Sequence, residues 1–357
     1  MSNSLPRISP AFLFACLLAM LQGLPSLTYA QEIRFSQYQA VPMMLNPANA
    51  GILPDYTLNI NYRVQNVGFL AYRSTYASFS VPFYDKKQEP RQLGGLALGF
   101  VSDVAGQANE IITTGASLSF AYQLRFDSYG VDALNFGLQT EFIQTRVDFG
   151  VLNWPSQVTY YGFDPGRRPD QLLEGRDNYL RFNAGLVWTH EPGRNKLRAE
   201  RSNRFHLGFA ASNLNTPSMS FISDGSYQVP LLYRMHGGAD LLLNRQLSLS
   251  PAFLMMLQNQ LFQYNIGAIL SITKVVRSVN NPGLNSLRLF AGSWYRSSDA
   301  LVFMLGASGR TFHAAVSYDA NAFRRKAGIQ AQGAFELSLA IKFLKEASPR
   351  KLSTPLF

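Results

Sequence analysis

Apolar and polar residues alternate along much of the chain with a period of two. Between residues 112 and 126 the even positions are mostly apolar, and the odd positions are mostly small or polar. The same alternation recurs over residues 261–274 and 335–343. Because successive side chains of a strand point to opposite faces of a sheet, this period predicts β-strands that each have one apolar face.

The length of these runs indicates the class of β protein. A strand that crosses a bilayer needs about 9 to 11 residues, whereas strands of globular proteins most often have about 5 to 6, and many runs here have about 10 to 17 residues. The less apolar face is rich in Gly, Ser, Thr, Gln and Asn, which suits a hydrated lumen, and aromatic residues gather near the ends of the runs. We therefore predict an all-β protein, a transmembrane antiparallel β-barrel of the outer-membrane type.

About fourteen strands are predicted, and an even number returns both ends of the barrel to one side, normally the periplasm. In strand 132–149 the apolar face changes from even to odd positions, which predicts a β-bulge. By strand parity the Gly- and Pro-rich loop 150–177 is extracellular, and it is interpreted as a lumen constriction, a partner surface or an idle loop. The predicted strands are 56–66, 68–83, 92–104, 110–126, 132–149, 178–192, 203–213, 229–243, 246–258, 261–274, 285–296, 299–308, 311–319 and 332–343.

Composition excludes several other classes of protein. Hydrophobic residues make up 47% of the 357 residues and charged residues 15%, where soluble domains carry about 25% charged residues; a disordered chain shows the reverse balance. After residue 30 no run approaches the ~18 apolar residues of a spanning helix. The formal net charge of +10 is scattered, so we expect no nucleic-acid partner and interpret the charge clusters as solvated loops near lipid headgroups.

The first 30 residues have the pattern of a secretory signal peptide. Arg7 precedes an apolar core at 11–21, and small residues precede a predicted cleavage after Ala30. The single cysteine, Cys16, also allows a lipoprotein cleavage site as a disfavoured alternative. Under the favoured cut the mature chain has no cysteine, so disulfides and thiol chemistry are excluded.

No catalytic, metal or cofactor motif is evident. The four histidines have no i, i+4 pair that would indicate a zinc site. The Gly94-Gly95 and Gly237-Gly238 pairs lack the Lys-Ser/Thr of a phosphate loop and are interpreted as strand glycines packed beside aromatic residues. We therefore expect no cofactor and no enzymatic activity.

The most specific signal is an ordered set of short motifs. It begins with Phe35-Ser36-Gln37, Pro42, Asn46-Pro47-Ala48 and Gly51; Pro47 biases Asn46 away from helix, which predicts a turn. Later members are Asn61-Tyr62-Arg63, Gln65, Asn213-Leu214, Pro217, Trp294-Tyr295-Arg296, Ser317-Tyr318-Asp319 and Glu336-Leu337-Ser338. In this order, over about residues 31 to 343, the motifs strongly resemble the PorP/SprF family of outer-membrane proteins of the type IX secretion system of Bacteroidota.

The resemblance implies a non-enzymatic role with the secretion and gliding machinery. Members of the family help to export a secreted adhesin or other cargo or to retain it at the cell surface, and they are linked to periplasmic ring and peptidoglycan-associated components. We expect these partners, together with outer-membrane lipid. The candidate partner-binding residues are Phe35, Ser36, Gln37, Pro42, Asn46, Pro47, Ala48, Gly51, Asn61, Tyr62, Arg63, Gln65, Trp154, Asn213, Leu214 and Pro217.

Several alternatives stay open at this stage. Residues 31–55 are predicted to form a periplasmic N-terminal segment that either plugs the barrel mouth or offers a docking surface, and 344–357 a periplasmic tail. A barrel of this size also allows passive uptake of hydrophobic or small solutes, and an outer-membrane hydrolase is a third, weaker reading. Many family members have a His-Leu pair where this chain has Asn213-Leu214, which bears on the choice of partner.

Overall fold

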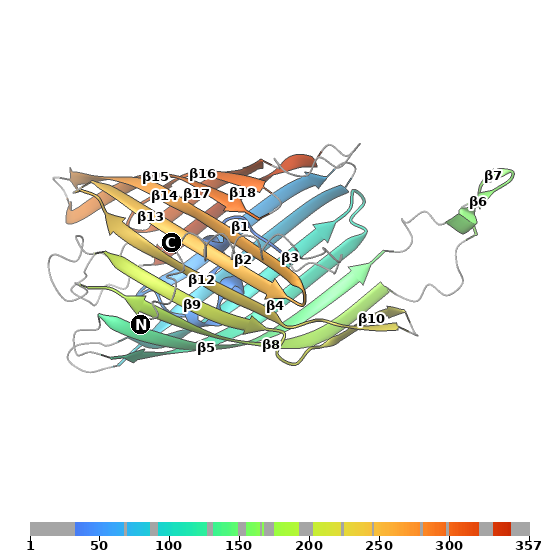
Figure 1. The fold of residues 1–357 in the computed structure, drawn as a ribbon, viewed down its shortest axis with the longest axis horizontal. Coiled ribbons are helices and arrows are strands. Elements are labelled where there is room, and N and C mark those ends of the chain that lie inside the picture. Colours follow the sequence, from blue (N-terminus) through green and yellow to red (C-terminus); the bar gives the residue numbers. More distant parts are fainter. Residues whose placement is uncertain are drawn as a thin grey trace, which may run out of the picture.

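A computed structural model describes residues 33–67, 70–85, 92–126, 131–148, 155–164, 166–167, 175–192, 203–222, 225–244, 246–278, 281–297, 300–320 and 331–343. Within these ranges, fourteen antiparallel strands form a closed barrel (Figure 1). The predicted fold class is confirmed. The predicted signal peptide and the predicted tail at 344–357 lie outside the described residues.

Each barrel strand overlaps one predicted strand. Closure is made by β1 and β18, with Tyr56 opposite Phe343 and Arg63 opposite Glu336. The barrel strands are β1 (Tyr56–Val67), β2 (Leu70–Tyr84), β3 (Gln92–Ala105), β4 (Ile111–Arg125), β5 (Asp132–Val147), β8 (Gly175–His190), β9 (Arg204–Ser212), β12 (Leu232–Leu242), β13 (Leu247–Gln258), β14 (Leu261–Ser278), β15 (Asn281–Arg296), β16 (Ala300–Ser308), β17 (Phe312–Ala320) and β18 (Ala331–Phe343).

Two short hairpins lie outside the closed sheet. One joins β6 (Val158–Thr159) to β7 (Gly162–Phe163) within the predicted loop 150–177, and the other joins β10 (Ser218–Ile222) to β11 (Gly225–Gln228). In Figure 1 the hairpin β6–β7 lies beyond one end of the barrel, and β10 runs beside β8. The alternation does not predict either hairpin, because strands of two to five residues are too short to show a period.

The predicted β-bulge in strand 132–149 is wrong. Strand β5 pairs with β4 in one continuous register from Ile111 opposite Val147 to Arg125 opposite Ala133. Ile143 remains on the inner face, 3% exposed, and it is close to Gly115 of β4. The apparent change of face therefore reflects an apolar side chain on the inner wall, where the missing side chain of Gly115 leaves room for it.

The two faces of the wall differ as the alternation predicts. On β4, Leu118 and Phe120 are 51% and 46% exposed on the outside, whereas Ser119 between them is fully buried inside. Every one of the fourteen barrel strands carries at least one large apolar side chain that is exposed on the outer face. Polar residues such as Asn61 and Gln139 fill the inner face. This is the distribution expected of a barrel that meets lipid outside and a polar lumen inside.

The two ends of the barrel differ in their connections. The terminus end contains Tyr56 and Phe343, where the barrel begins and closes, and the loop end contains Val147 and Gly175, which flank the longest connection. None of the described helices is long and apolar enough to cross a membrane.

Candidate functional site

Residues 33–55, called here the lumen segment, lie inside the barrel (Figure 1). The segment contains the short helices η1 (Tyr38–Ala40), α2 (Pro42–Leu45) and η2 (Pro47–Asn49). Tyr38 and Leu45 belong to an apolar cluster with residues of β13 to β17, whereas Phe35 and Val41 belong to another with residues of β2, β3 and β4. Because it packs against opposite sides of the wall, the lumen segment bridges the interior of the barrel.

Two prolines set the local path of the lumen segment. Pro42 and Pro47 each stand in the first turn of a helix, where the missing N–H is not needed and the fixed φ suits the helix. Asn46, which precedes Pro47, is extended with φ −160°, and its Oδ1 accepts a 2.9 Å hydrogen bond from the N–H of Ala48. The predicted turn at Asn46-Pro47-Ala48 is therefore confirmed.

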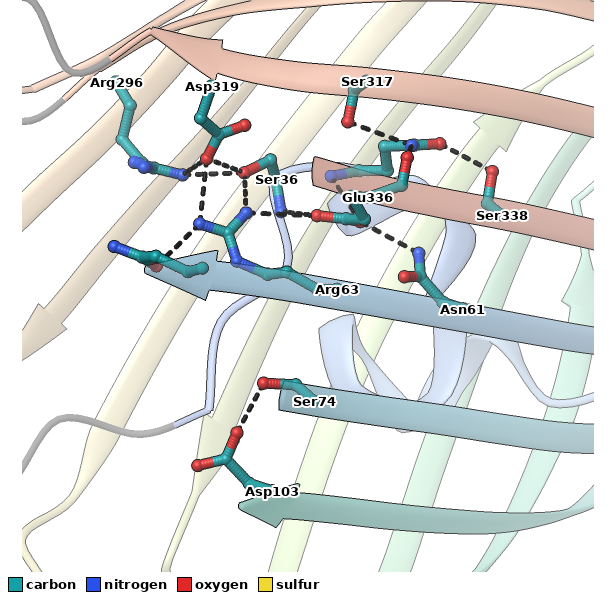
Figure 2. A network of polar contacts seen from close by, with 12 residues as sticks. Ser36, Asn61, Arg63, Ser74, Asp103, Arg296, Ser317, Asp319, Glu336 and Ser338 are labelled. Atoms are coloured by element: carbon teal, nitrogen blue, oxygen red, sulfur yellow. Dashed lines mark hydrogen bonds and ion pairs between the residues drawn. The ribbon is translucent and has the colours of Figure 1, made fainter. Parts of the chain in front are cut away.

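The carboxylate of Glu336 on β18 binds the beginning of the lumen segment (Figure 2). It accepts hydrogen bonds from the backbone N–H of Ser36 at 2.7 Å and of Gln37 at 3.0 Å. The amide of Asn61 on β1 donates to the same carboxylate at 2.9 Å. One buried carboxylate thus satisfies two backbone donors that have no partner in a helix or strand.

The side chain of Gln37 fixes the register of the segment against two strands. Its Nε2 donates to Ser317 Oγ on β17 and to the carbonyl of Glu336 on β18, both at 3.0 Å. Its Oε1 accepts from Ser338 Oγ at 2.6 Å. An amide that is bonded at both its donor and its acceptor cannot slide by one residue without losing these contacts.

Two arginines and a second carboxylate surround the hydroxyl of Ser36 (Figure 2). Ser36 Oγ donates to Asp319 Oδ2 at 2.6 Å and accepts from Arg296 at 2.8 Å and from Arg63. Asp319 forms ion pairs with Arg63 at 2.9 Å and Arg296 at 3.0 Å, and Arg63 also pairs with Glu336 at 3.2 Å. We call Ser36, Gln37, Asn61, Arg63, Arg296, Asp319 and Glu336 the loop-end network.

Charges balance within the loop-end network. Arg63 and Arg296 are each 5% exposed, Glu336 is 2% exposed and Asp319 is fully buried. Removing charges from water costs several kcal/mol per ion, and only close pairing and further hydrogen bonds offset this cost. Each of these four ions has at least two such partners, so loss of any member, Ser36 included, would leave a buried ion with fewer partners.

Asn46 anchors the middle of the lumen segment to the opposite side of the wall. Its Nδ2 donates to the carbonyls of Leu186 on β8 at 3.0 Å and Phe209 on β9 at 3.2 Å, and it lies 3.2 Å from His236 Nε2 on β12. Asn46 is fully buried. A single amide therefore contacts three consecutive strands of the barrel.

Glycines on the inner wall allow the backbone of the lumen segment to come close to the barrel strands. A Cβ at Gly137 on β5 would lie 2.1 Å from the nitrogen of Ala48, and one at Gly185 on β8 would lie 2.0 Å from Asn46 Oδ1. A Cβ at Gly95 would lie 2.5 Å from the Cα of Gly51. The interpretation of Gly94-Gly95 as glycines packed beside aromatic residues is wrong for Gly95, which instead admits the backbone of the lumen segment.

The polar groups of this site bind a segment of the protein's own chain. Among the residues that the structure describes, no group of three or more His, Cys, Asp or Glu side chains is placed to hold a metal ion. Burial raises the pKa of the Tyr38 hydroxyl on the lumen segment, so this group stays neutral. The ionic groups present are used to bind backbone N–H groups and the hydroxyl of Ser36.

A protein-family model matches most of the chain. The model of the type IX secretion system membrane protein PorP/SprF matches residues 27–341. The chain belongs to the PorP/SprF family. The predicted resemblance is confirmed, and family and fold are those of an outer-membrane barrel component and not of an enzyme family.

Solved structures resemble the chain only distantly. The toluene transporter TbuX of Ralstonia pickettii is 12% identical, with a TM-score of 0.46, and 85% of this chain and 93% of that chain are covered. A FadL homologue of Pseudomonas aeruginosa is 11% identical, with a TM-score of 0.44 and coverages of 84% and 93%. No curated protein matches the sequence.

Most PorP/SprF motif residues lie within or against the lumen segment. Pro47, Ala48 and Gly51 are buried in it beside the residues already described. On β1, Gln65 accepts a 3.0 Å hydrogen bond from Arg63, whereas Tyr62 points outward and is 41% exposed. Their role in partner binding stays a prediction, and Trp154 lies outside the described residues.

Asn213 belongs to a second polar cluster, away from the loop-end network. It has a positive φ of 62°, a conformation that Asn tolerates better than most residues, and its N–H donates to Asn183 Oδ1 at 3.0 Å. Asn183 in turn lies beside the 2.8 Å ion pair between Arg181 and Glu141. The next residue, Leu214, is 46% exposed, whereas Pro217 is buried.

Three residues of the PorP/SprF loop-end network were not among the predicted site residues. Arg296, Asp319 and Glu336 lie in three of the quoted motifs, but the sequence does not reveal that these motifs meet. The available signal was parity, because a charged residue on the less apolar face of a spanning strand must point into the lumen.

Proposed function

We propose that this PorP/SprF protein is a non-enzymatic outer-membrane component that helps to export a secreted adhesin or other type IX cargo or to anchor it at the cell surface. Family membership supports a place in the secretion system. The observation that carries the proposal is the lumen segment, which is bonded to many strands of the wall and so leaves the barrel better suited to support partners than to pass solutes.

The hairpin β6–β7 is the proposed contact for cargo. Tyr160 and Tyr161 are 97% and 96% exposed, with Val158 and Phe163 beside them at 71% and 56%. The two tyrosine rings pack edge to face at 5.4 Å. Exposed aromatic groups are typical of interface hot spots, because they bury a large area at low cost in side-chain entropy.

We further propose an orientation in which the terminus end faces the periplasm and the loop end faces the cell exterior. In this orientation residues 1–30 act as a signal peptide cleaved after Ala30, and the tail at 344–357 faces periplasmic components of the secretion machinery. The lumen segment then acts as a plug and not as a docking surface, because the side chains of Ser36, Gln37 and Asn46 are bonded to the protein's own wall.

Passive uptake of hydrophobic or small solutes is the competing function. Uptake requires a continuous path for the solute through the barrel. The lumen segment contacts strands on opposite sides of the interior and so crosses that path. Uptake therefore requires the segment to leave its network of buried ions, which is costly.

The proposal is tested by replacing the hairpin aromatics in the producing cell. The double variant Tyr160→Ser, Tyr161→Ser is expected to lower the amount of one adhesin or other cargo at the surface, measured by mass spectrometry of surface-shaved peptides. Asp164→Asn, just after the hairpin, is the matched control, because it keeps the Oδ1 that accepts from the N–H of Gly166. Barrel abundance should not change. Normal surface display in the double variant and in a deletion strain, together with a growth defect on one solute, would support uptake instead.

A further inference from the structure

Two adjoining cavities lie between the lumen segment and the wall in the terminus-end half of the barrel. Both cavities are lined by Gln39, Ile269 and His313. Arg204, Asp240 and Arg288 line the first cavity, and Lys342 lines the second. We call Arg204, Asp240, Arg288, His313 and Lys342, with the space between them, the cationic chamber.

Positive charge exceeds negative charge in the chamber. Its three cations face one carboxylate, Asp240, which is already bound by Arg204 at 3.3 Å and by Ser250 Oγ at 2.5 Å. The cations are close enough that the charge of Arg204 acts on both Arg288 and Lys342. Asp55, at the end of the lumen segment, is the acidic group that acts on Lys342.

Two of the cations have no direct partner within the described part of the chain. No hydrogen bond or ion pair joins the side chain of Arg288 or Lys342 to another described residue, although Lys342 is only 5% exposed. The Arg288 Nε is buried without a hydrogen bond. A buried cation without a partner is unfavourable, so such groups normally bind an anion or lose their charge.

His313 provides a further donor between these two cations. It lines both cavities, and its Nδ1 is buried without a hydrogen-bond partner among the described residues. The ring of Phe290 stacks on the imidazole at 4.9 Å with an interplanar angle of 11°, which holds the ring in place. The chamber therefore presents a guanidinium, an ammonium and an imidazole from β15, β18 and β17.

We propose that the cationic chamber binds an oxyanion, a carboxylate or a phosphate group, between Arg288, Lys342 and His313. Guanidinium and ammonium groups form short, charge-assisted hydrogen bonds with such oxygens, and the planar fork of arginine matches their geometry. The site is distinct from the loop-end network, and the proposal does not rest on the cargo-anchoring function.

The test measures anion binding by the purified full-length barrel in detergent. Isothermal titration with inorganic phosphate and with succinate, in chloride buffer of constant ionic strength, is expected to show saturable binding of at least one of them. Lys342→Met and Arg288→Gln should each weaken that binding about ten- to a hundredfold, because each removes a charge-assisted hydrogen bond. Arg167→Gln, which changes an exposed arginine just after strand β7, is the matched control and should bind as the unchanged protein does.

The results with phosphate and with succinate distinguish the two kinds of ligand. Phosphate binding alone assigns the site to phosphate groups, and succinate binding alone assigns it to carboxylates. Lys342→Arg and Arg288→Lys keep the charge and should retain binding, and heat-dependent gel migration shows whether every variant is folded. Absence of saturable binding of both anions, or equal binding by the unchanged protein and by folded Lys342→Met and Arg288→Gln, would overturn the proposal.

Discussion

The two halves of the barrel interior use charge differently. In the loop-end half, Arg63 and Arg296 are matched by Asp319 and Glu336, and the four ions enclose the hydroxyl of Ser36. In the terminus-end half, the three cations of the chamber share one lining carboxylate, Asp240, and Lys342 is also acted on by Asp55 of the lumen segment. The four ions of the loop-end network balance one another, whereas the cations of the chamber outnumber its acidic groups.

This difference separates a structural role from a binding role. Charges that are fully paired inside a protein fix the position of what they pair with, which here is the beginning of the lumen segment. Charges without partners contribute nothing to the fold and incur a desolvation cost. Mutations that remove one charge from each half should therefore have effects of opposite sign.

The largest effect is expected for Glu336→Ala in the loop-end network. The variant leaves Arg63 with one fewer partner and removes the acceptor of two backbone N–H groups of the lumen segment. Breaking a buried pair in this way costs about 3 to 5 kcal/mol. Urea unfolding in detergent measures the loss, and proteolysis between residues 33 and 55 shows whether the segment is released. Unchanged stability would show that the network does not hold the segment.

A smaller loss of stability is expected for Gly137→Ala, which tests how closely the lumen segment packs against strand β5. The added Cβ would lie 2.1 Å from the backbone nitrogen of Ala48, so the segment or strand β5 must move. Overpacking of this kind costs about 1 to 3 kcal/mol. The expected result is a barrel that still migrates as folded but whose lumen segment is cleaved faster by protease. Thr140→Ala, on the outer face of the same strand, is the control and should leave cleavage unchanged.

Lys342→Met is expected to keep or raise the free energy of unfolding, which is the opposite of the effect of Glu336→Ala. The substitution replaces a buried, unpaired ammonium by an apolar side chain of similar length, so it should leave the barrel as stable or more stable, by about 1 kcal/mol. Urea unfolding in chloride buffer without phosphate or carboxylate measures the change. A loss of several kcal/mol would show that Lys342 has a structural partner and that the two halves do not differ.

The sequence predicts the wall of the barrel better than its contents. A period of two, repeated in runs long enough to span a bilayer, is a local property. By this period Arg125, Glu141, Glu336 and Lys342 fall on the face opposite their apolar neighbours; in the structure Glu141, Glu336 and Lys342 are buried on the inner face, and Arg125 is half-buried. The same reasoning failed at Ile143, because an inward apolar residue imitates a change of face. Local alternation cannot distinguish a bulge from such a residue.

The meeting of distant motifs could not be predicted from the sequence. Ser36, Arg63, Arg296 and Asp319 are separated by up to 283 residues and come together only when β1 pairs with β18 and the segment enters the barrel. The cationic chamber was missed for the same reason. Arg204 belongs to a charge cluster interpreted as a solvated loop, yet it lines the lumen because it begins strand β9.

The smallest effect is expected for an ion pair that lies outside both halves of the lumen. Asp164 and Arg167, just after strand β7, are 3.5 Å apart with side chains 50% and 66% exposed. Exposed pairs contribute less than about 1 kcal/mol, since water already solvates both charges and salt screens their attraction. Asp164→Asn keeps Oδ1, which accepts from the N–H of Gly166 at 2.9 Å, and removes only the charge. The midpoint of barrel unfolding should not move, and trypsin cleavage at Arg167 should change little and less still at high salt. A shift as large as that of Glu336→Ala would mean that burial is not what makes the loop-end network strong.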